Sequence, residues 1–191
     1  PYTMEYLVRD NGTVIVTGSI DLTGTKLPEL PRFGMRMELH QPYENLTYYG
    51  RGPFENYIDR YSGAFIGRYE DKVENQFYWY TRPQETGNKT DVRWLTLLDS
   101  GGLGVKITGL QPIAFSALHF SPEDLDPGLT RKLQHTIDIV PQKNIFLHVD
   151  LKQRGLGGDN SWGMYPYNKY RLLDKKYVYS YMIELAEKGS D

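Results

Sequence analysis

Apolar and polar residues alternate along much of this chain with a period of two. Successive side chains of a β-strand point to opposite faces, so the alternation indicates antiparallel strands with one buried face. The clearest cases are residues 33–40, 103–108, 145–151 and 177–184. Turn-forming residues separate such segments at positions 10–12, 99–102, 141–144 and 173–176. The turn at 99–102 lies between two strand-like segments and therefore predicts a tight hairpin.

Helical patterns are rare in this sequence. Ser121 precedes a proline and two acidic residues, which is typical of a helix N-cap, and Pro127 with Gly128 ends that helix after about one turn. About ten short strands without βαβ spacing predict an all-β fold, a sandwich of two antiparallel sheets. No repeat or linker divides the chain, so we expect residues 1–191 to form one domain. The sequence starts at Pro1 without an initiator methionine, which favours a fragment of a longer polypeptide.

The composition narrows the classes of function. Basic and acidic residues nearly cancel, 22 against 24, and neither forms a long block, which disfavours a nucleic-acid-binding surface. The absence of cysteine excludes disulfide bonds and thiolate metal sites, and it fits the cytoplasm and the periplasm equally well. No apolar stretch approaches the ~20 residues that cross a bilayer, so no membrane partner is expected. The 16 tyrosines are best explained by a sheet-rich fold, because aromatic residues suit a half-buried sheet surface. Contact with carbohydrate is the more specific alternative.

Titratable residues give weak candidates for chemistry. Glu55, Asp59 and Arg60 follow a segment with two glycines and a proline, and they are candidate catalytic carboxylates with an electrostatic partner. Glycoside hydrolysis needs two carboxyl groups roughly 5–10 Å apart, and sequence spacing fixes no such distance here. We therefore expect these side chains to stabilise the loop through hydrogen bonds and ion pairs. The polar segment 82–94 is too long for a simple hairpin, and a docking or structural role is expected for it.

The four histidines do not have the spacing of a metal site such as H-E-x-x-H. They are His40, His119, His135 and His148. We expect them at the surface or in hydrogen-bond networks, and we predict no metal site.

A glycine-dense segment at residues 155–163 carries a tryptophan and differs from its strand-patterned surroundings. Glycines allow the backbone to turn tightly or to approach another surface closely, and Asp159, Asn160 and Ser161 can brace the turn. Trp162 is then either a plug for the core or a flat platform for an outside partner. Sugar rings commonly bind such platforms, because their C–H faces are apolar and their edges form hydrogen bonds.

Four segments of the chain occur in the order of a known set of motifs. They are LPRFGM at 30–35, GRGPFENYIDR at 50–60, RPQETG at 82–87 and GGDNSW at 157–162. Together they resemble the C-terminal, small-chain region (domain 5) of bacterial β-galactosidases of glycoside hydrolase family 2. The resemblance covers residues 30 to about 185, and residues 1–29 resemble the leading strands before it.

The resemblance implies an antiparallel β-supersandwich related to galactose mutarotases. It places the two catalytic glutamates on a TIM barrel of the same parent polypeptide, so this chain alone is expected to be non-catalytic. Trp162 corresponds to the family's tryptophan that stacks on the sugar, with Asp159, Asn160 and Ser161 shaping its loop as substrate-binding residues. The implied substrate is a terminal β-galactoside such as lactose. Stacking of its sugar on Trp162 is expected to contribute about 1–2 kcal/mol to binding. The family implies no cofactor in this domain and Mg²⁺ and Na⁺ as candidates for the parent.

Two departures from the family pattern leave alternatives open. Phe54 stands where a polar residue is usual, and residues 163–166 differ from the family's Ser-Pro continuation, so the preferred aglycone is not fixed. One alternative is a freestanding carbohydrate-binding module. The other is a mutarotase-like sugar epimerase, which needs a glutamate base and a histidine acid in one pocket; Glu123 and His119 are loose candidates.

Overall fold

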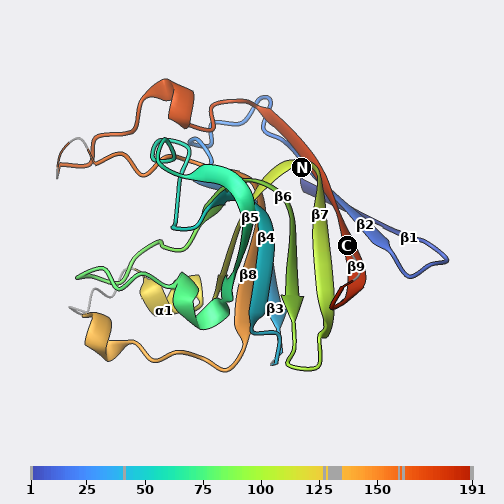
Figure 1. Ribbon diagram of the computed structural model, residues 1–191. Coiled ribbons are helices and arrows are strands. Elements are labelled where there is room, and N and C mark those ends of the chain that lie inside the picture. Colours follow the sequence, from blue (N-terminus) through green and yellow to red (C-terminus); the bar gives the residue numbers. More distant parts are fainter. Residues whose placement is uncertain are drawn as a thin grey trace.

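The computed structural model describes residues 2–40, 42–126, 128, 135–158, 160 and 162–189. Nine β-strands make up about half of this described part (Figure 1). They are β1 (Tyr2–Val8), β2 (Val14–Asp21), β3 (Arg32–Leu39), β4 (Asn45–Gly52), β5 (Phe65–Lys72), β6 (Lys89–Leu98), β7 (Leu103–Leu118), β8 (Ile145–Gln153) and β9 (Lys176–Glu187). The short helix α1 (Pro122–Leu125) and the 3₁₀ turns η1 (Val73–Gln76), η2 (Thr136–Asp138) and η3 (Asn168–Tyr170) lie between them. The predicted all-β class is confirmed.

The strands pair antiparallel in one hydrogen-bonded network. Seven of them follow the order β1-β2-β9-β7-β6-β4-β5, while β8 pairs with β7 and β3 pairs with β8. The long strand β7 is the junction, because residues 103–109 pair with β9 and residues 114–118 pair with β8. A strand that changes neighbours in this way joins two packed layers. The two expected sheets are therefore continuous through β7.

Side-chain contacts show which strands face each other across the core. The ring of Phe33 in β3 packs on Tyr177 and Tyr179 of β9, with centroids 5.7 and 5.5 Å apart. The Tyr179 hydroxyl donates to the backbone oxygen of Val149 in β8 at 3.1 Å. Strands β3 and β8 thus lie opposite β9, and the structure is sandwich-like.

The predicted alternation produces a large buried core. In β6 and β8, apolar side chains such as Leu95, Leu97, Ile145 and Leu147 are at most 1% exposed. Five tyrosines are also buried. Four of them lie in β4 or β9, which confirms the sheet interpretation for those four, whereas Tyr57 lies in the loop after β4. The five are Tyr48, Tyr57, Tyr177, Tyr179 and Tyr181.

The local signals at two turns are confirmed. At the β6–β7 hairpin, the Asp99 amide donates to Leu103 O at 2.8 Å, and the Asp99 side chain accepts from the Leu103 amide at 2.9 Å. At α1, Ser121 and Asp124 form a reciprocal capping box, in which each side chain accepts from the other residue's backbone amide. Ser121 is therefore the N-cap that the sequence predicts.

Two strand assignments need correction. The alternate positions of β8 are not solvent-facing, because Phe146 and Asp150 are buried as well as Ile145 and Leu147. The second half of segment 82–94 is not loop: β6 begins at Lys89 and continues through the rest of it. Its register with β7 shifts between Lys89 and Trp94, and this irregularity hides the strand pattern in the sequence.

Three loops gather at one edge of the sandwich (Figure 1). One follows β4 and contains residues 53–64, one lies between η1 and β6, and one follows β8. All three lie on the left of the sheet in Figure 1, and they contain three of the four motifs that the sequence analysis identified. We call this region the loop edge.

Candidate functional site

Trp162 is exposed at the loop edge. Its side chain is 90% exposed, and its backbone amide donates to the Asn160 side chain at 2.8 Å. Gly163 follows with a φ of +82°, a conformation that favours glycine. Asp159 and Ser161, also predicted as loop-shaping, substrate-binding residues, lie outside the described residues. The Trp162 side chain therefore does not fill the core. It has the exposed arrangement that a platform for an outside partner requires.

Asp59 fixes the base of the Trp162 loop to the loop after β4. Its Oδ2 atom accepts a hydrogen bond from the Gly157 amide at 2.8 Å. A Cβ atom on Gly155 would lie 2.6 Å from the Asp59 carboxylate, so the close approach requires glycine there. The Gly155 amide in turn donates to the backbone oxygen of Tyr170 at 2.8 Å. The loop that carries Trp162 is thus anchored at its base.

Glu55 joins the loop after β4 to the segment before β6. Its carboxylate accepts from the Thr86 hydroxyl at 2.9 Å, from the Gly87 amide at 2.8 Å and from the Tyr80 hydroxyl. Arg60 lies 3.6 Å away as an ion-pair partner. Glu55, like Asp59, is therefore engaged in loop contacts of the kind that the sequence analysis expected.

Asn56 lies at the centre of these connections and is fully buried. Its Nδ2 donates to the backbone oxygens of Arg51 and Phe54, each at 3.0 Å, and its Oδ1 accepts from the Thr90 amide at 2.9 Å. Its own amide donates to Asn88 O at 2.8 Å. Buried polar groups that are paired in this way hold a loop in one conformation. The Asn in the motif at 50–60 is therefore a structural residue.

Tyr165 is a second exposed aromatic side chain near Trp162, at 56% exposure. The guanidinium groups of Arg154 and Arg171 lie 5.3 and 4.6 Å from its ring centroid. Glu29 holds both arginines, with Arg154 Nη1 at 2.9 Å and Arg171 Nε at 2.6 Å. Burial opposes charge on Glu29, but these two arginines outweigh it and hold its pKa below the ordinary value. Sequence reasoning missed this platform, because Glu29 and Arg171 are far apart in the chain.

A partly buried cluster of charged residues surrounds Arg32, the arginine of the motif at 30–35, and Asp150 is its buried member. Its Nε lies 3.1 Å from Asp150 Oδ2, and its Nη2 lies 2.9 Å from Glu85 Oε1. Burial raises the Asp150 pKa to about 7, although the positive charge of Arg32 acts to lower it. The Glu85 pKa is raised by burial too, while the His148 pKa is lowered to about 4 by burial and by the nearby Arg32 and Arg36. A Cβ atom on Gly34 would lie 1.9 Å from Asp150, which explains the glycine in this motif.

The remaining histidines form no metal centre. Among the described residues, no group of three or more histidine or acidic side chains is placed to hold a metal ion. His119 Nε2 lies 3.1 Å from the Glu44 carboxylate. His148 belongs to the cluster around Arg32, and the other two, His40 and His135, are exposed.

The loose candidates for an epimerase acid–base pair have separate partners. Glu123 accepts two hydrogen bonds from Arg36 Nη1, at 2.9 and 2.7 Å, while His119 contacts Glu44.

Across the described part of the molecule, no helix has the length and apolar character needed to span a membrane.

The geometry defines a β-sandwich-like domain whose loop edge carries an anchored, exposed tryptophan. The family described as "Beta galactosidase small chain" matches residues 1–183. The chain is 36% identical over 167 residues to a β-galactosidase of Priestia megaterium, covering 87% of the chain and 16% of that protein. It is 35% identical over 181 residues to a β-galactosidase of Streptococcus thermophilus, covering 94% of the chain and 17% of that protein. A third relative, β-galactosidase BgaC of Bifidobacterium adolescentis, is 34% identical over 176 residues, covering 89% of the chain and 16% of that protein.

The chain therefore belongs to the β-galactosidase small-chain family. It spans about a sixth of the length of these relatives.

Proposed function

We propose that this chain is the C-terminal domain of a retaining β-galactosidase and that it completes the rim of the active site with Trp162. In this proposal the catalytic acid/base and nucleophile are glutamates on a barrel domain of the parent polypeptide. The small-chain domain packs against that barrel and contributes one wall of the subsite for the leaving-group sugar. Its own residues bind and position the substrate; they do not break the bond.

The observation that carries the proposal is the exposure of the Trp162 side chain on an anchored loop. An indole that is 90% exposed contributes little to the core, so its ring is accessible to an outside partner. The Asp59–Gly157 hydrogen bond fixes the base of the loop before any ligand binds. Such preorganisation reduces the entropy that binding must otherwise remove. Stacking of a sugar ring on the indole then contributes about 1–2 kcal/mol.

The comparisons support the parent enzyme class. The curated relatives are named β-galactosidases, and the chain aligns with only about 16% of the length of the first of them. The proposal therefore assigns substrate and bond cleavage to the whole polypeptide, and substrate positioning to this domain.

The test uses the full-length enzyme with Trp162→Ala. We expect the KM for lactose to rise about 5- to 30-fold, or transfer to acceptor sugars to weaken similarly, because the stacking energy of about 1–2 kcal/mol is lost. The melting temperature should stay nearly unchanged. Trp79→Ala is the matched control, because Trp79 is also exposed (55%) but packs on Phe77 and Phe120. Unchanged kinetics in Trp162→Ala, or a large loss of stability, would refute the proposed role.

Two further observations separate the proposal from its rivals. A gene sequence upstream of Pro1 that encodes a barrel with paired glutamates supports it, whereas a freestanding chain with sugar affinity of its own favours a carbohydrate-binding module. Rapid polarimetry on freshly dissolved galactose tests the epimerase alternative. We expect no acceleration of mutarotation, because Glu123 and His119 contact different partners.

A further inference from the structure

Strand β1 forms a free edge of the sheet and lacks the features that protect such edges. It pairs with β2 alone, in an unbroken register from Tyr2 opposite Ile20 to Val8 opposite Val14. Its seven residues contain one charge, Glu5, and no proline. Figure 1 shows the β1–β2 hairpin projecting from the sheets on the side away from the loop edge. A regular, open edge of this kind is a template for pairing with a further strand.

The other edge strands in the described part of the chain, β3 and β5, are protected. β5 lies at the opposite end of the strand order from β1, and four of its eight residues are charged. β3 has three charged residues, and its register with β8 shifts between Phe33 and Gly34. Charged side chains and bulges are common means of preventing edge-to-edge pairing. The fold therefore blocks these two edges and leaves β1 open.

The backbone pairing shows which groups of β1 point outward. The Arg9 amide donates to Thr13 O at 2.9 Å, and the register of β1 with β2 continues from this bonded pair. Bonded and non-bonded pairs alternate along an antiparallel ladder. The N–H and C=O groups of Met4, Tyr6 and Val8 therefore face away from β2. Among the described residues, these outward groups have no hydrogen-bond partner.

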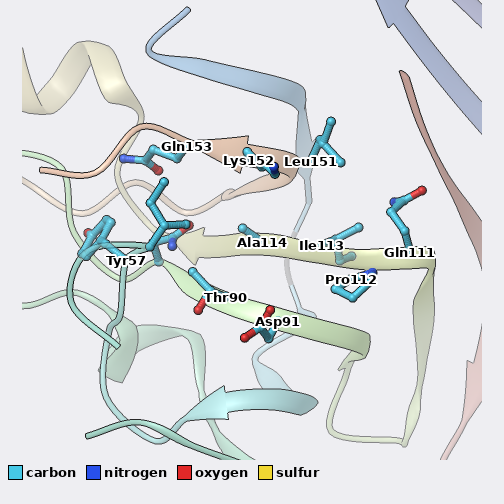
Figure 2. Close-up of a pocket in the computed structure, with 12 residues that line it drawn as sticks. Tyr57, Thr90, Asp91, Gln111, Pro112, Ile113, Ala114, Leu151, Lys152 and Gln153 are labelled. Atoms are coloured by element: carbon cyan, nitrogen blue, oxygen red, sulfur yellow. The ribbon is translucent and has the colours of Figure 1, made fainter. Parts of the chain in front are cut away.

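In another part of the sheet, a side chain pairs with free strand backbone. The pairing of β7 with β9 ends at Gly109 and Tyr181, and Ser180 is the next residue of β9. The Gln111 side chain accepts from the Ser180 amide at 3.2 Å and donates to Ser180 O at 3.1 Å. Gln111 lies at one end of the cleft that Figure 2 shows. No described side chain does the same for β1, so its outer edge is available to another strand.

The side chains of β1 also leave apolar surface uncovered. Tyr2, Tyr6, Leu7 and Val8 are each more than half exposed. On the inner side, the Tyr2 ring lies edge-on to Phe33 of β3, with centroids 6.4 Å apart. Neighbouring residues on paired strands contact each other and stabilise the sheet. A further strand would therefore cover these side chains and pair with the outward N–H and C=O groups together.

We propose that a strand of the parent polypeptide, from the part that precedes Pro1, pairs antiparallel with the outer edge of β1. This inference rests on the proposed function, in which the chain is the C-terminal domain of a longer enzyme. The relatives support a longer parent, because the chain spans about a sixth of their length.

The position of Pro1 favours this occupant over others. The preceding polypeptide joins the chain directly before β1, so a short hairpin turn brings it back along the free edge. A parallel partner would need a connection of about a dozen residues or more. The added strand has apolar residues at every second position, on the face that it shares with Tyr2 and Tyr6.

Hydrogen–deuterium exchange in the full-length enzyme, resolved to single amides, tests the proposal. On a free edge, the outward amides of Met4, Tyr6 and Val8 exchange about 100-fold or more faster than the paired amides of Glu5 and Leu7. With a strand on that edge, we expect both sets to exchange within about tenfold of each other, after correction for intrinsic rates. Glu5 and Leu7 are the internal control, because β2 pairs with them in either case. A fast–slow alternation along β1 overturns the proposal.

Tyr6→Pro tests the backbone pairing directly. Proline removes the outward N–H, which a free edge tolerates and a paired strand does not. We expect exchange at Met4 and Val8 to become about tenfold faster or more, while Glu5 and Leu7 report whether β1 still pairs with β2. Tyr6→Ala is the matched control, because it removes the ring and keeps the N–H. Equal exchange at Met4 and Val8 in the two variants would overturn the proposal.

Dilution separates the preceding segment from a second copy of the chain. A covalently attached strand protects β1 at every enzyme concentration, whereas protection by a second copy decreases on dilution. Protection that decreases in this way overturns the proposal. The role proposed at the active-site rim is decided by lactose kinetics, and the present inference by exchange in β1, so each can fail without the other.

Discussion

Aromatic side chains have opposite environments in the strand core and at the loop edge. In the core, the hydroxyls of Tyr48 and Tyr179 donate to backbone oxygens while their rings are buried at 1% and 2% exposure. At the loop edge, Trp162 and Tyr165 are mainly exposed, and polar groups contact the backbone of Trp162 and the ring of Tyr165. Ring type therefore does not decide the role of an aromatic residue. What decides it is how much of the ring the rest of the chain buries.

Removing a core ring should have the largest effect on stability. Phe115 is fully buried and lies edge-on to Tyr48, with centroids 5.2 Å apart. Phe115→Ala should lower the free energy of unfolding by about 3–5 kcal/mol, because it removes packing and leaves a cavity. Denaturant unfolding measures the loss, and Phe115→Leu should lose clearly less. Equal losses in Phe115→Ala and Trp162→Ala would contradict the contrast between the two regions.

The charged cluster should produce a pH dependence of stability. An unfolded aspartate loses its proton near pH 4, whereas folded Asp150 keeps it until about pH 7 because the carboxyl is buried. Between these values the folded state binds more protons, so this group lowers the free energy of unfolding as the pH rises. Two charged groups act on Asp150 and change the size of this effect: Arg32 favours its ionised form, and Glu85 disfavours it.

Asp150→Asn tests this effect. The free energy of unfolding of the variant minus that of the wild type should rise between pH 4 and pH 7, by on the order of a few kcal/mol. Urea unfolding at several pH values measures it. A difference that stays constant with pH would show that Asp150 titrates normally in the folded chain.

The anchor of the Trp162 loop should have a smaller, local effect. Asp59→Ala removes the acceptor of the Gly157 amide, and a lost hydrogen bond to a charged group costs about 1–3 kcal/mol. The loop should also become more mobile, which lowers the steady-state fluorescence anisotropy of an engineered probe at Trp162. Asp59→Asn keeps an acceptor oxygen, so its stability and its probe anisotropy should lie between those of the wild type and of Asp59→Ala. An unchanged loop in Asp59→Ala would mean that other contacts anchor it.

The smallest effect is expected at the second aromatic platform. Tyr165→Ala removes two cation–π contacts and should cost about 0.5–1 kcal/mol, because the ring is largely exposed. Tyr165→Phe keeps the ring and should behave like the wild type. Thermal unfolding measures both variants. A loss above that of Asp59→Ala would place Tyr165 in the core class.

Local rules predicted much of the fold. The period-two pattern identified strands such as β3 and β9, because antiparallel strands with one buried face repeat every second residue. The N-cap at Ser121 and the turn at Asp99 depend on neighbouring residues, and the structure confirms both. The strand in the second half of segment 82–94 lacks the period-two pattern, because the bulges in β6 break the alternation.

The site was less accessible from sequence, because its contacts join distant residues. Asp59 was considered as a weak catalytic carboxylate, and its contact with Gly157 spans 98 positions, which no local pattern reports. The same holds for Arg32 with Asp150, and for Glu29 with Arg171. The position of Trp162 was narrowed to two arrangements by its glycine-rich setting, and only its exposure in the structure distinguished between them.

The double pairing of β7 has a consequence for how the chain unfolds. Because β7 supplies hydrogen bonds to β9 with its first half and to β8 with its second, we expect the two halves of the structure to unfold together. Amide hydrogens of β8 and β9 should then exchange with solvent at a common slow rate, as one cooperative unit. Amides of exposed residues in the Trp162 loop, such as Met164, should exchange much faster, and a protease should cut at such positions before it cuts in the strands.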